Sequence, residues 1–352
     1  MTKISPIIGH EKVQAQLVRL MGQGILPHAI LLTGPKGIGK AALADTLARC
    51  LLTGASDVDG GAQEESLFGD ALPEVLPTTL SYDADHPAIA RIEAGGHGNI
   101  KRVEPLKDEK KKMSFTTINV DQVREDIVDF LHHTTAEKGW RIVMVDPADG
   151  LNPNAENALL KILEEPPKQT LLVLITHQPD KLLPTTRSRC REFKLLPPTV
   201  EQVVEILAKQ RITLSAEQQQ WLTQLAPVSV GQWARYVERE ADVIYADWLE
   251  LLAAQTIPKL QSFVTKAAKQ DAEGWQLVGD LLLCALHRLS ISAHSPLELL
   301  AVEQQHFPTL LARAEPQHWQ HLWQQAVEWL PRTTRSNYDK KQIDVENNFS
   351  KR

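Results

Sequence analysis

The chain has 352 residues, of which 43% are hydrophobic and 23% charged, and this is enough apolar material for a large core spread over two or three domains. Its net charge of −6 excludes a protein that holds nucleic acid by itself through a broad basic face. No apolar run reaches the roughly 18 residues of a membrane span, and the first residues lack the apolar core of a signal peptide. We therefore expect a cytoplasmic protein that makes no contact with a membrane.

The cysteines predict neither disulfides nor a metal site. Cys50, Cys190 and Cys284 lie far apart and are odd in number. They form neither a disulfide framework nor the paired spacing of a zinc site. We interpret all three as reduced, small apolar side chains.

Short apolar runs alternate with amphipathic helical patterns in the first half of the chain. Runs without polar interruption suit strands that are buried on both faces of a parallel sheet. In chain order, the pattern predicts a strand over 28–33, helices after Lys40 and after Asp121, a strand over 141–145, a helix from Pro153 and a strand over 171–176. This order predicts a doubly wound α/β domain.

The helix between the second and third predicted strands is marked at both ends. Asn152 is placed as its N-cap and Pro153 as its first residue. Proline is tolerated at this position because the first N–H groups of a helix have no hydrogen-bond partner within the helix. Pro166 and Pro167 end it, because proline cannot continue a helix.

Two other regions depart from this alternation. Residues 53–117 are rich in Gly, Asp, Glu and Pro, and they are predicted to form an insertion with long loops. After Pro198 the pattern becomes helical to the end. Two capping-box signatures mark the starts of two successive helices: Thr199 with Gln202, and Ser215 with Gln218.

A glycine-rich segment joins the first predicted strand to the helix that follows it. In such a loop, backbone N–H groups wrap phosphates, the helix N-terminus adds positive potential, and a lysine reaches the outer phosphates. The segment consists of Gly34, Pro35, Lys36, Gly37, Ile38, Gly39, Lys40 and Ala41. It predicts a phosphate-binding P-loop. The alternative is a glycine-rich turn that binds nothing, since Ala41 lacks the hydroxyl that would hold magnesium.

Asp146 ends the second predicted strand, where the aspartate that anchors the metal of a P-loop protein belongs. The alternative is a turn acid ahead of Pro147, and the P-loop upstream favours the first interpretation. Thr176, which ends the third strand, is included in the predicted nucleotide site.

Longer stretches of the chain resemble a known family. Residues 146–149 and 154–167 resemble the "ADxMNxxAxNALLKxLEEPP" stretch of clamp-loader ATPases of the AAA+ class, and residues 182–190 resemble their "LLPTIxSRC" segment. The resemblance is specific over residues 4–52 and 118–198 and only architectural over the helical remainder. Shorter matches are Ile8-Gly9-His10, His28-Ala29 and residues 118–124.

Within this family, the departures resemble the delta-prime type of subunit rather than the gamma and tau motors. Motor subunits keep a P-loop hydroxyl, a glutamate after the Walker-B aspartate, an arginine after the glycine that starts the sensor-2 helix, and a four-cysteine zinc module. Here Ala41, Pro147 and Gln232 take the first three places. The resemblance therefore implies a chain that does not hydrolyse ATP by itself and holds ATP or ADP with Mg²⁺ only weakly. We expect no zinc, since His86 and His97 are interpreted as exposed loop histidines.

Arg189 is the residue that such a subunit is expected to retain. In the family, the arginine of the Ser-Arg-Cys segment projects across a subunit interface towards the γ-phosphate of a neighbour's ATP, where it stabilises the transferring phosphoryl group. The resemblance implies this arginine-finger role for Arg189. The alternative is that Arg187, Arg189 and Arg191, which alternate, form the solvent face of a strand.

By resemblance, residues 1–196 form a RecA-like AAA+ domain, residues 197–245 a helical lid, and residues 246–352 a helical collar that oligomerises. The implied partners are gamma or tau subunits, a delta subunit, the sliding clamp and primed DNA, within a DNA-directed DNA polymerase holoenzyme.

Two rival functions remain open. The first is an active AAA+ clamp-loader or helicase-loader ATPase, against which the three departures count. The second is an unrelated P-loop enzyme such as a nucleotide kinase, which needs acceptor-binding acids and a lid arginine cluster.

Overall fold

The computed structural model describes residues 3–4, 7–54, 79–108, 113–114, 117–132, 139–254, 256–268, 270–292 and 297–335. The chain divides into two compact units. The first comprises Met1–Lys209 with Ser229–Gly231, and the second comprises Gln210–Val228 with Gln232–Arg352. The predicted division into three domains, at residues 196 and 245, remains a prediction.

In the described part of the first unit, five strands form a parallel sheet. Their order is β4-β7-β8-β2-β9, and every neighbouring pair is parallel. The strands are β2 (Ala29–Thr33), β4 (Ile100–Val103), β7 (Arg141–Val145), β8 (Thr170–Thr176) and β9 (Arg191–Lys194). The predicted α/β class with a parallel sheet is confirmed, and β2, β7 and β8 match the three predicted strands.

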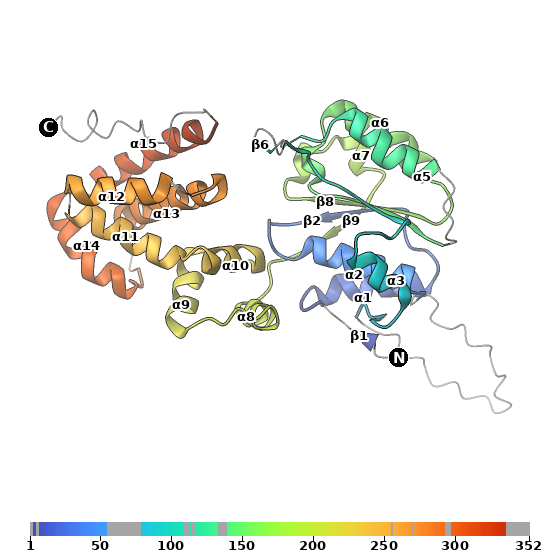
Figure 1. Cartoon of the computed structure of the whole chain (residues 1–352), viewed down its shortest axis with the longest axis horizontal. Coiled ribbons are helices and arrows are strands. Elements are labelled where there is room, and N and C mark those ends of the chain that lie inside the picture. The colour runs from blue at the N-terminus through green and yellow to red at the C-terminus, as the bar shows by residue number, and fades with distance from the viewer. Residues whose placement is uncertain are drawn as a thin grey trace. The chain divides into compact units, whose positions relative to one another are not determined.

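Helices cover both faces of this sheet (Figure 1). On one face lie α1 (Glu11–Gly22), α2 (Lys40–Leu52) and α3 (Pro87–Glu93). The other face is covered by α4 (Val120–Val123), the π-helical turn Arg124–Asp129, α5 (Phe130–His132) and α6 (Pro153–Glu164), with the short α7 (Pro184–Arg187) beside α6.

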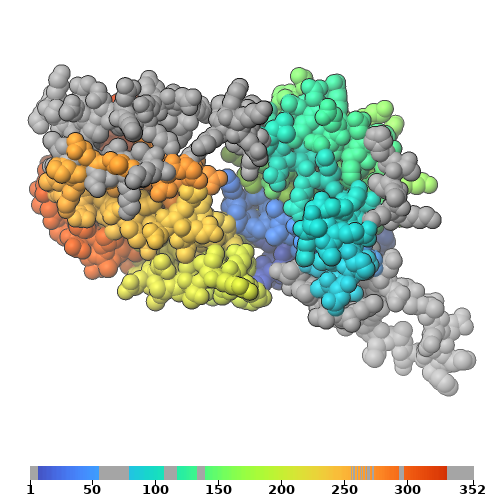
Figure 2. Space-filling view, in the orientation of Figure 1, coloured from blue at the N-terminus to red at the C-terminus, as the bar shows by residue number. Residues whose placement is uncertain are grey.

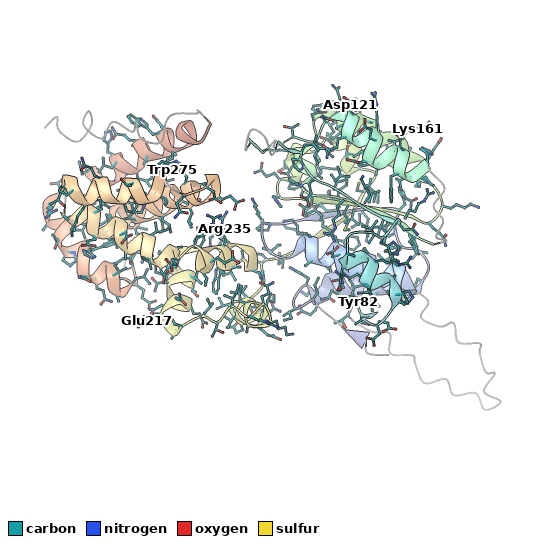
Figure 3. The ribbon with its side chains drawn as sticks, in the orientation of Figure 1. Tyr82, Asp121, Lys161, Glu217, Arg235 and Trp275 are labelled. Carbon is teal, nitrogen blue, oxygen red and sulfur yellow. The ribbon has the colours of Figure 1, made fainter. Side chains whose placement is uncertain are left out.

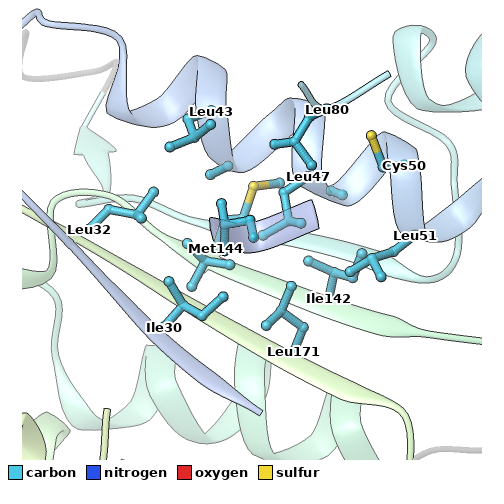
Figure 4. Close-up of a cluster of buried hydrophobic side chains, with 14 of the residues drawn as sticks. Ile30, Leu32, Leu43, Leu47, Cys50, Leu51, Leu80, Ile142, Met144 and Leu171 are labelled. Atoms are coloured by element: carbon cyan, nitrogen blue, oxygen red, sulfur yellow. The ribbon is translucent and has the colours of Figure 1, made fainter. Parts of the chain in front are cut away.

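An apolar core lies on each face of the sheet because side chains of each central strand alternate between its two faces. In β7, Ile142 and Met144 face the side of α2, and Val143 and Val145 face the side of α6. Figure 4 shows Met144 close to Leu47 of α2. Burial on both faces explains why the central strands read as uninterrupted apolar runs.

Helix α6 begins where the sequence predicts. The side chain of Asn152 accepts a hydrogen bond from Ala155 N–H at 2.8 Å, and Pro153 is the first helical residue. The inward face of the helix carries buried residues such as Leu159, whereas Lys161 is exposed and points away from the sheet (Figure 3). The helix is therefore held by one apolar face and a satisfied N-terminus.

The range 53–117, predicted as a loop-rich insertion, contains structure that belongs to the sheet. β4 is an edge strand that pairs with β7, and α3 forms part of the outer surface of the first unit, in cyan in Figure 2. Two-residue strands complete this region: β3 (Tyr82–Asp83) pairs with β1 (Lys3–Ile4), and β5 (Lys107–Asp108) pairs with β6 (Met113–Ser114). Residues 55–78, 109–112 and 115–116 lie outside the described residues.

The described part of the chain after Pro198 is helical, as predicted. Both predicted capping boxes form, with Gln218 N–H donating to Ser215 Oγ at 3.1 Å and Gln202 N–H donating to Thr199 Oγ1 at 3.3 Å. None of the described helices is long and apolar enough to cross a membrane. The helices are α8 (Val200–Lys209), α9 (Ala216–Leu225), α10 (Val230–Glu238), α11 (Ala241–Ala254), α12 (Ile257–Ala268), α13 (Ala272–Ile291), α14 (Ala301–Arg313) and α15 (Pro316–Arg335).

A buried polar network joins three helices of the second unit. Glu303 of α14, 0% exposed, accepts hydrogen bonds at 2.6 Å from Tyr245 of α11 and, through both of its oxygens, from Arg288 of α13. Leu300 N–H also donates to the Glu303 carboxylate, and Arg288 donates to the carbonyl oxygen of Glu298. We call Tyr245, Arg288 and Glu303 the Glu303 network.

Candidate functional site

The predicted P-loop lies where β2 ends and α2 begins, at the carboxyl edge of the parallel sheet. Gly34 has a φ of +143°, and a Cβ at this position would lie 2.6 Å from the carbonyl oxygen of Leu195. The sharp turn after β2 therefore requires glycine at residue 34. His10, the residue just before α1, braces the loop, since its Nε2 donates to the carbonyl oxygen of Ile38 at 2.8 Å.

Lys40 folds back onto its own loop. Its ammonium donates to the carbonyl oxygens of Gly34 and Pro35, both at 2.6 Å, and the residue is only 3% exposed. Burial lowers the pKa of Lys40 to about 8, against the opposing attraction of Asp146 and Asp149. The structure thus brings the predicted lysine and the predicted metal-anchoring aspartate into one electrostatic cluster.

The carboxylates of this cluster differ in their surroundings. Burial raises the pKa of Asp146, although Lys40 pulls in the opposite direction. Burial would also raise the pKa of Asp149, but hydrogen bonds from His177 N–H at 2.9 Å and from the Thr176 hydroxyl at 2.8 Å outweigh it and hold that pKa below its usual value. The hydroxyl of Thr176, which is predicted as a nucleotide contact, therefore donates a hydrogen bond to Asp149.

His177 is a site residue that the sequence analysis missed. Burial and then the charge of Lys40 lower its pKa, with Asp149 opposing. The histidine is thus biased towards its neutral form beside the P-loop lysine. Its position directly after Thr176, at the carboxyl end of a central strand, is the signal that would have found it.

A distant segment of the chain is bonded to the P-loop within the first unit. Ser229 Oγ donates to the carbonyl oxygen of Lys36 at 3.2 Å, and Gly231 N–H donates to the carbonyl oxygen of Gly37 at 3.1 Å. The predicted sensor-2 helix start is therefore bonded to the P-loop, and its sensor-2 role remains a prediction. Gln232, which follows, donates to the hydroxyl of Tyr236 at 3.0 Å.

The groups that would complete a hydrolytic site are different in this chain. Ala41, the first residue after Lys40 in α2, offers a methyl group where a magnesium-binding hydroxyl would stand. Pro147 follows Asp146 and carries no acid. Asp149 is a second carboxylate near Lys40, and it is engaged by two hydrogen bonds.

Arg189 lies between α7 and β9 rather than on a strand. One guanidinium nitrogen pairs with Glu164 Oε1 at 2.7 Å, another donates to the carbonyl oxygen of Thr185 at 3.0 Å, and the side chain is 35% exposed. Arg187 belongs to the end of α7 and pairs with Asp180, while Arg191 starts β9. The three arginines therefore do not form one solvent face of a strand.

Strand register places Arg189 at the amino ends of the parallel strands, whereas the P-loop lies at their carboxyl ends. β9 runs parallel to β2, with Arg191 beside Ile30 and Lys194 beside Thr33. Arg189 therefore precedes the amino end of β9, whereas the P-loop follows the carboxyl end of β2. A strand of this length separates the two by roughly 15 Å.

The two loop histidines correct one expectation. His97 is only 7% exposed and not a surface residue, and its Nδ1 accepts the N–H of Asn99 just before β4. His86 caps α3 by accepting the N–H of Ala88. The absence of zinc stays a prediction, and metal analysis of the purified chain tests it.

Several proteins that are similar in sequence to this chain are DNA polymerase III subunits. A family described as "DNA polymerase III, delta subunit" matches residues 77–199. The DNA polymerase III subunit delta' of Pseudomonas aeruginosa is 33% identical over 267 residues, which cover 75% of this chain and 70% of that protein. The DNA polymerase III subunit gamma/tau of Mycobacterium tuberculosis is 29% identical over 195 residues, or 54% of this chain and 28% of that protein.

A solved structure, a DNA polymerase III gamma subunit-related protein from Thermotoga maritima, is 14% identical with a TM-score of 0.42, covering 91% of this chain and 99% of that one. The extent and identity of the match to the Pseudomonas subunit decide the assignment. The chain belongs to the family of DNA polymerase III delta' subunits.

Proposed function

We propose that this chain is the stationary, hydrolysis-deficient subunit of a clamp loader. In this role it assembles with gamma or tau subunits and a delta subunit, and it helps them place the sliding clamp on primed DNA. It supplies Arg189 to the ATP site of a neighbouring motor subunit. Family membership supports the assembly, and the geometry of the first unit supports the division of labour.

One observation carries the proposal: Arg189 and the chain's own P-loop lie at opposite edges of the same parallel sheet. A guanidinium separated from its own phosphate loop by the length of a strand has no means of acting there. It is partly exposed, and so it is available to a nucleotide bound by another chain. Planar guanidinium groups suit the oxygens of a transferring phosphoryl group.

The chain's own P-loop fits phosphates better than it fits catalysis. Its backbone, the N-terminus of α2 and Lys40 form a cradle that suits the phosphates of ATP or ADP. Mg²⁺ would be held by Asp146 without a hydroxyl from Ala41. Lys40 must first leave the two loop carbonyls, which is a cost that supports weak binding.

The test compares two variants of the full chain assembled with its own gamma or tau and delta partners. Arg189→Ala is expected to lower the ATPase and clamp-loading rates of the complex while leaving assembly intact. The motor site concerned should lose roughly 10³-fold or more in rate, and total ATPase should fall in part because the other motor sites keep their arginines. The control is Lys40→Ala, which should change both rates far less.

The main rival function is an active AAA+ clamp-loader or helicase-loader ATPase. Under our proposal, the purified chain turns over no ATP above background, because neither the metal hydroxyl nor the catalytic acid is in place. Magnesium-dependent turnover near one per second by the pure chain, or clamp loading that needs Lys40 but not Arg189, would establish the rival.

A further inference from the structure

We propose that Glu164 is a positioning residue for Arg189, and that it acts by holding the guanidinium at the amino edge of the sheet for the neighbour's nucleotide. This inference rests on the proposed role of Arg189 in trans. Glu164 has no evident role in stabilising α6.

Glu164 is at an unfavourable place for a carboxylate. It is the last residue of α6, where the free carbonyl groups give the helix end a partial negative charge. An acid here repels the helix end unless a cation offsets it. Arg189 is that cation, with its guanidinium 2.7 Å from Glu164 Oε1.

The α6 helix is a rigid base for this contact. Its inward residues Leu159 and Leu163 are buried in the core, and the carbonyl oxygen of Leu163 accepts a hydrogen bond from His28 Nε2 at 3.0 Å. The position of Glu164 is therefore fixed by packing one residue before it and by the two prolines that follow Glu165.

A second carboxylate of α6 holds the other end of the segment that carries Arg189. Glu156, only 2% exposed, accepts the N–H of Leu183 at 2.9 Å, which fixes the start of α7. Glu156 and Glu164 are about two turns apart on α6. The short segment from Leu183 to Arg189 thus bonds to one helix at both of its ends.

The two contacts of Arg189 leave donors for a ligand. Glu164 and the carbonyl oxygen of Thr185 each take one N–H of the guanidinium. An arginine carries five such donors in a rigid plane. A guanidinium held at two of them keeps its plane fixed and its remaining donors available to phosphate oxygens, which is the condition for preorganised stabilisation of charge.

The experiment is a double-mutant cycle in the assembled complex, with ATPase measured at saturating and limiting ATP. Glu164→Ala is expected to slow the motor site that Arg189 serves about two- to fivefold, in keeping with a partly exposed ion pair, so the total kcat should fall by less than it does in Arg189→Ala and KM should not change. Glu164→Gln keeps an oxygen in the same place and should restore most of the rate. The matched control is Glu165→Gln, a change of the same charge at the exposed neighbour of Glu164.

The cycle separates positioning from a general structural role. In the Arg189→Ala background, Glu164→Ala should have no further effect on kcat, because it acts through the guanidinium alone. An equal loss in both backgrounds, no loss from Glu164→Ala, or a gain in rate would each overturn the inference. If Arg189→Ala itself has no effect, the proposed function fails instead, so the two failures are distinct.

Discussion

Two regions of this molecule bury charge, and they do so in opposite ways. In the Glu303 network, both carboxylate oxygens of Glu303 accept hydrogen bonds, and the guanidinium of Arg288 donates to both of them. In the cluster at the P-loop, which we call the P-loop cluster and which contains Lys40, Asp146 and Asp149, burial lowers the pKa of the lysine and raises that of Asp146.

The contrast separates a structural use of buried charge from a binding use. A fully bonded network gains nothing further from a ligand, and it fixes the packing of the helices that supply it. A lysine bonded only to carbonyl oxygens of its own loop, and partly desolvated, would gain from the arrival of phosphates. The P-loop cluster therefore has the electrostatics that our proposal of a phosphate-binding site requires.

The largest expected effect comes from breaking the Glu303 network. Glu303→Ala should lower the free energy of unfolding of the second unit by about 3–5 kcal/mol, because Arg288 would be left buried without its carboxylate. Denaturant unfolding followed by tryptophan fluorescence reports this unit, since of the eight tryptophans only Trp140 lies outside it.

The control for this prediction is Glu328→Ala on the exposed side of α15, which should change the free energy of unfolding by no more than about 0.5 kcal/mol. A loss below about 1 kcal/mol for Glu303→Ala would show that the network contributes little.

A smaller effect, and one that depends on pH, is expected at the P-loop cluster. The pKa of Lys40 is lowered to about 8 in the folded chain, so the folded state releases this proton at a lower pH than the unfolded state does. Between about pH 8 and pH 10.5 the unfolded state binds more protons, and the stability of the wild type should rise by about 1–3 kcal/mol relative to Lys40→Met.

Chemical denaturation of both chains across this pH window measures that difference. Lys36→Met is the matched control for the loss of a lysine from this loop, because Lys36 is exposed. A flat difference for Lys40→Met would mean that the lysine is not desolvated in the folded chain.

The smallest effect is expected from trimming the Glu303 network without breaking it. Tyr245→Phe removes one hydrogen bond to Glu303 but leaves the pair with Arg288, so the free energy of unfolding should fall by about 1 kcal/mol. The same fluorescence measurement applies. A loss as large as that of Glu303→Ala would mean that the hydroxyl of Tyr245, and not the ion pair, holds the three helices together.

Sequence reasoning found the central strands because burial on both faces leaves a plain apolar signal. It did not find β4, whose residues Lys101 and Arg102 are polar because an edge strand meets a neighbour on one side only. The range around β4 was accordingly interpreted as an insertion. A composition rich in Gly, Pro and charge cannot distinguish a loop from a short strand at the edge of a sheet.

At the site, the residue types of the P-loop, Asp146 and Thr176 follow from the order of motif, strand and helix. The partners of these residues do not. That Lys40 bonds to its own loop, and that Glu164 meets Arg189, depends on side-chain rotamers and on packing between segments far apart in the sequence. His177 carries a position signal but no motif, and the sequence analysis therefore missed it.

The bonds from Ser229 and Gly231 to the P-loop have a consequence for how the chain may be shortened. A truncation after Lys209 keeps every strand of the described sheet, yet it removes the donors to the carbonyl oxygens of Lys36 and Gly37. Those two oxygens would then depend on solvent, and the loop would lose its attachment to the rest of the fold on that side. A shortened chain therefore has to include Gly231 to keep the loop as it is.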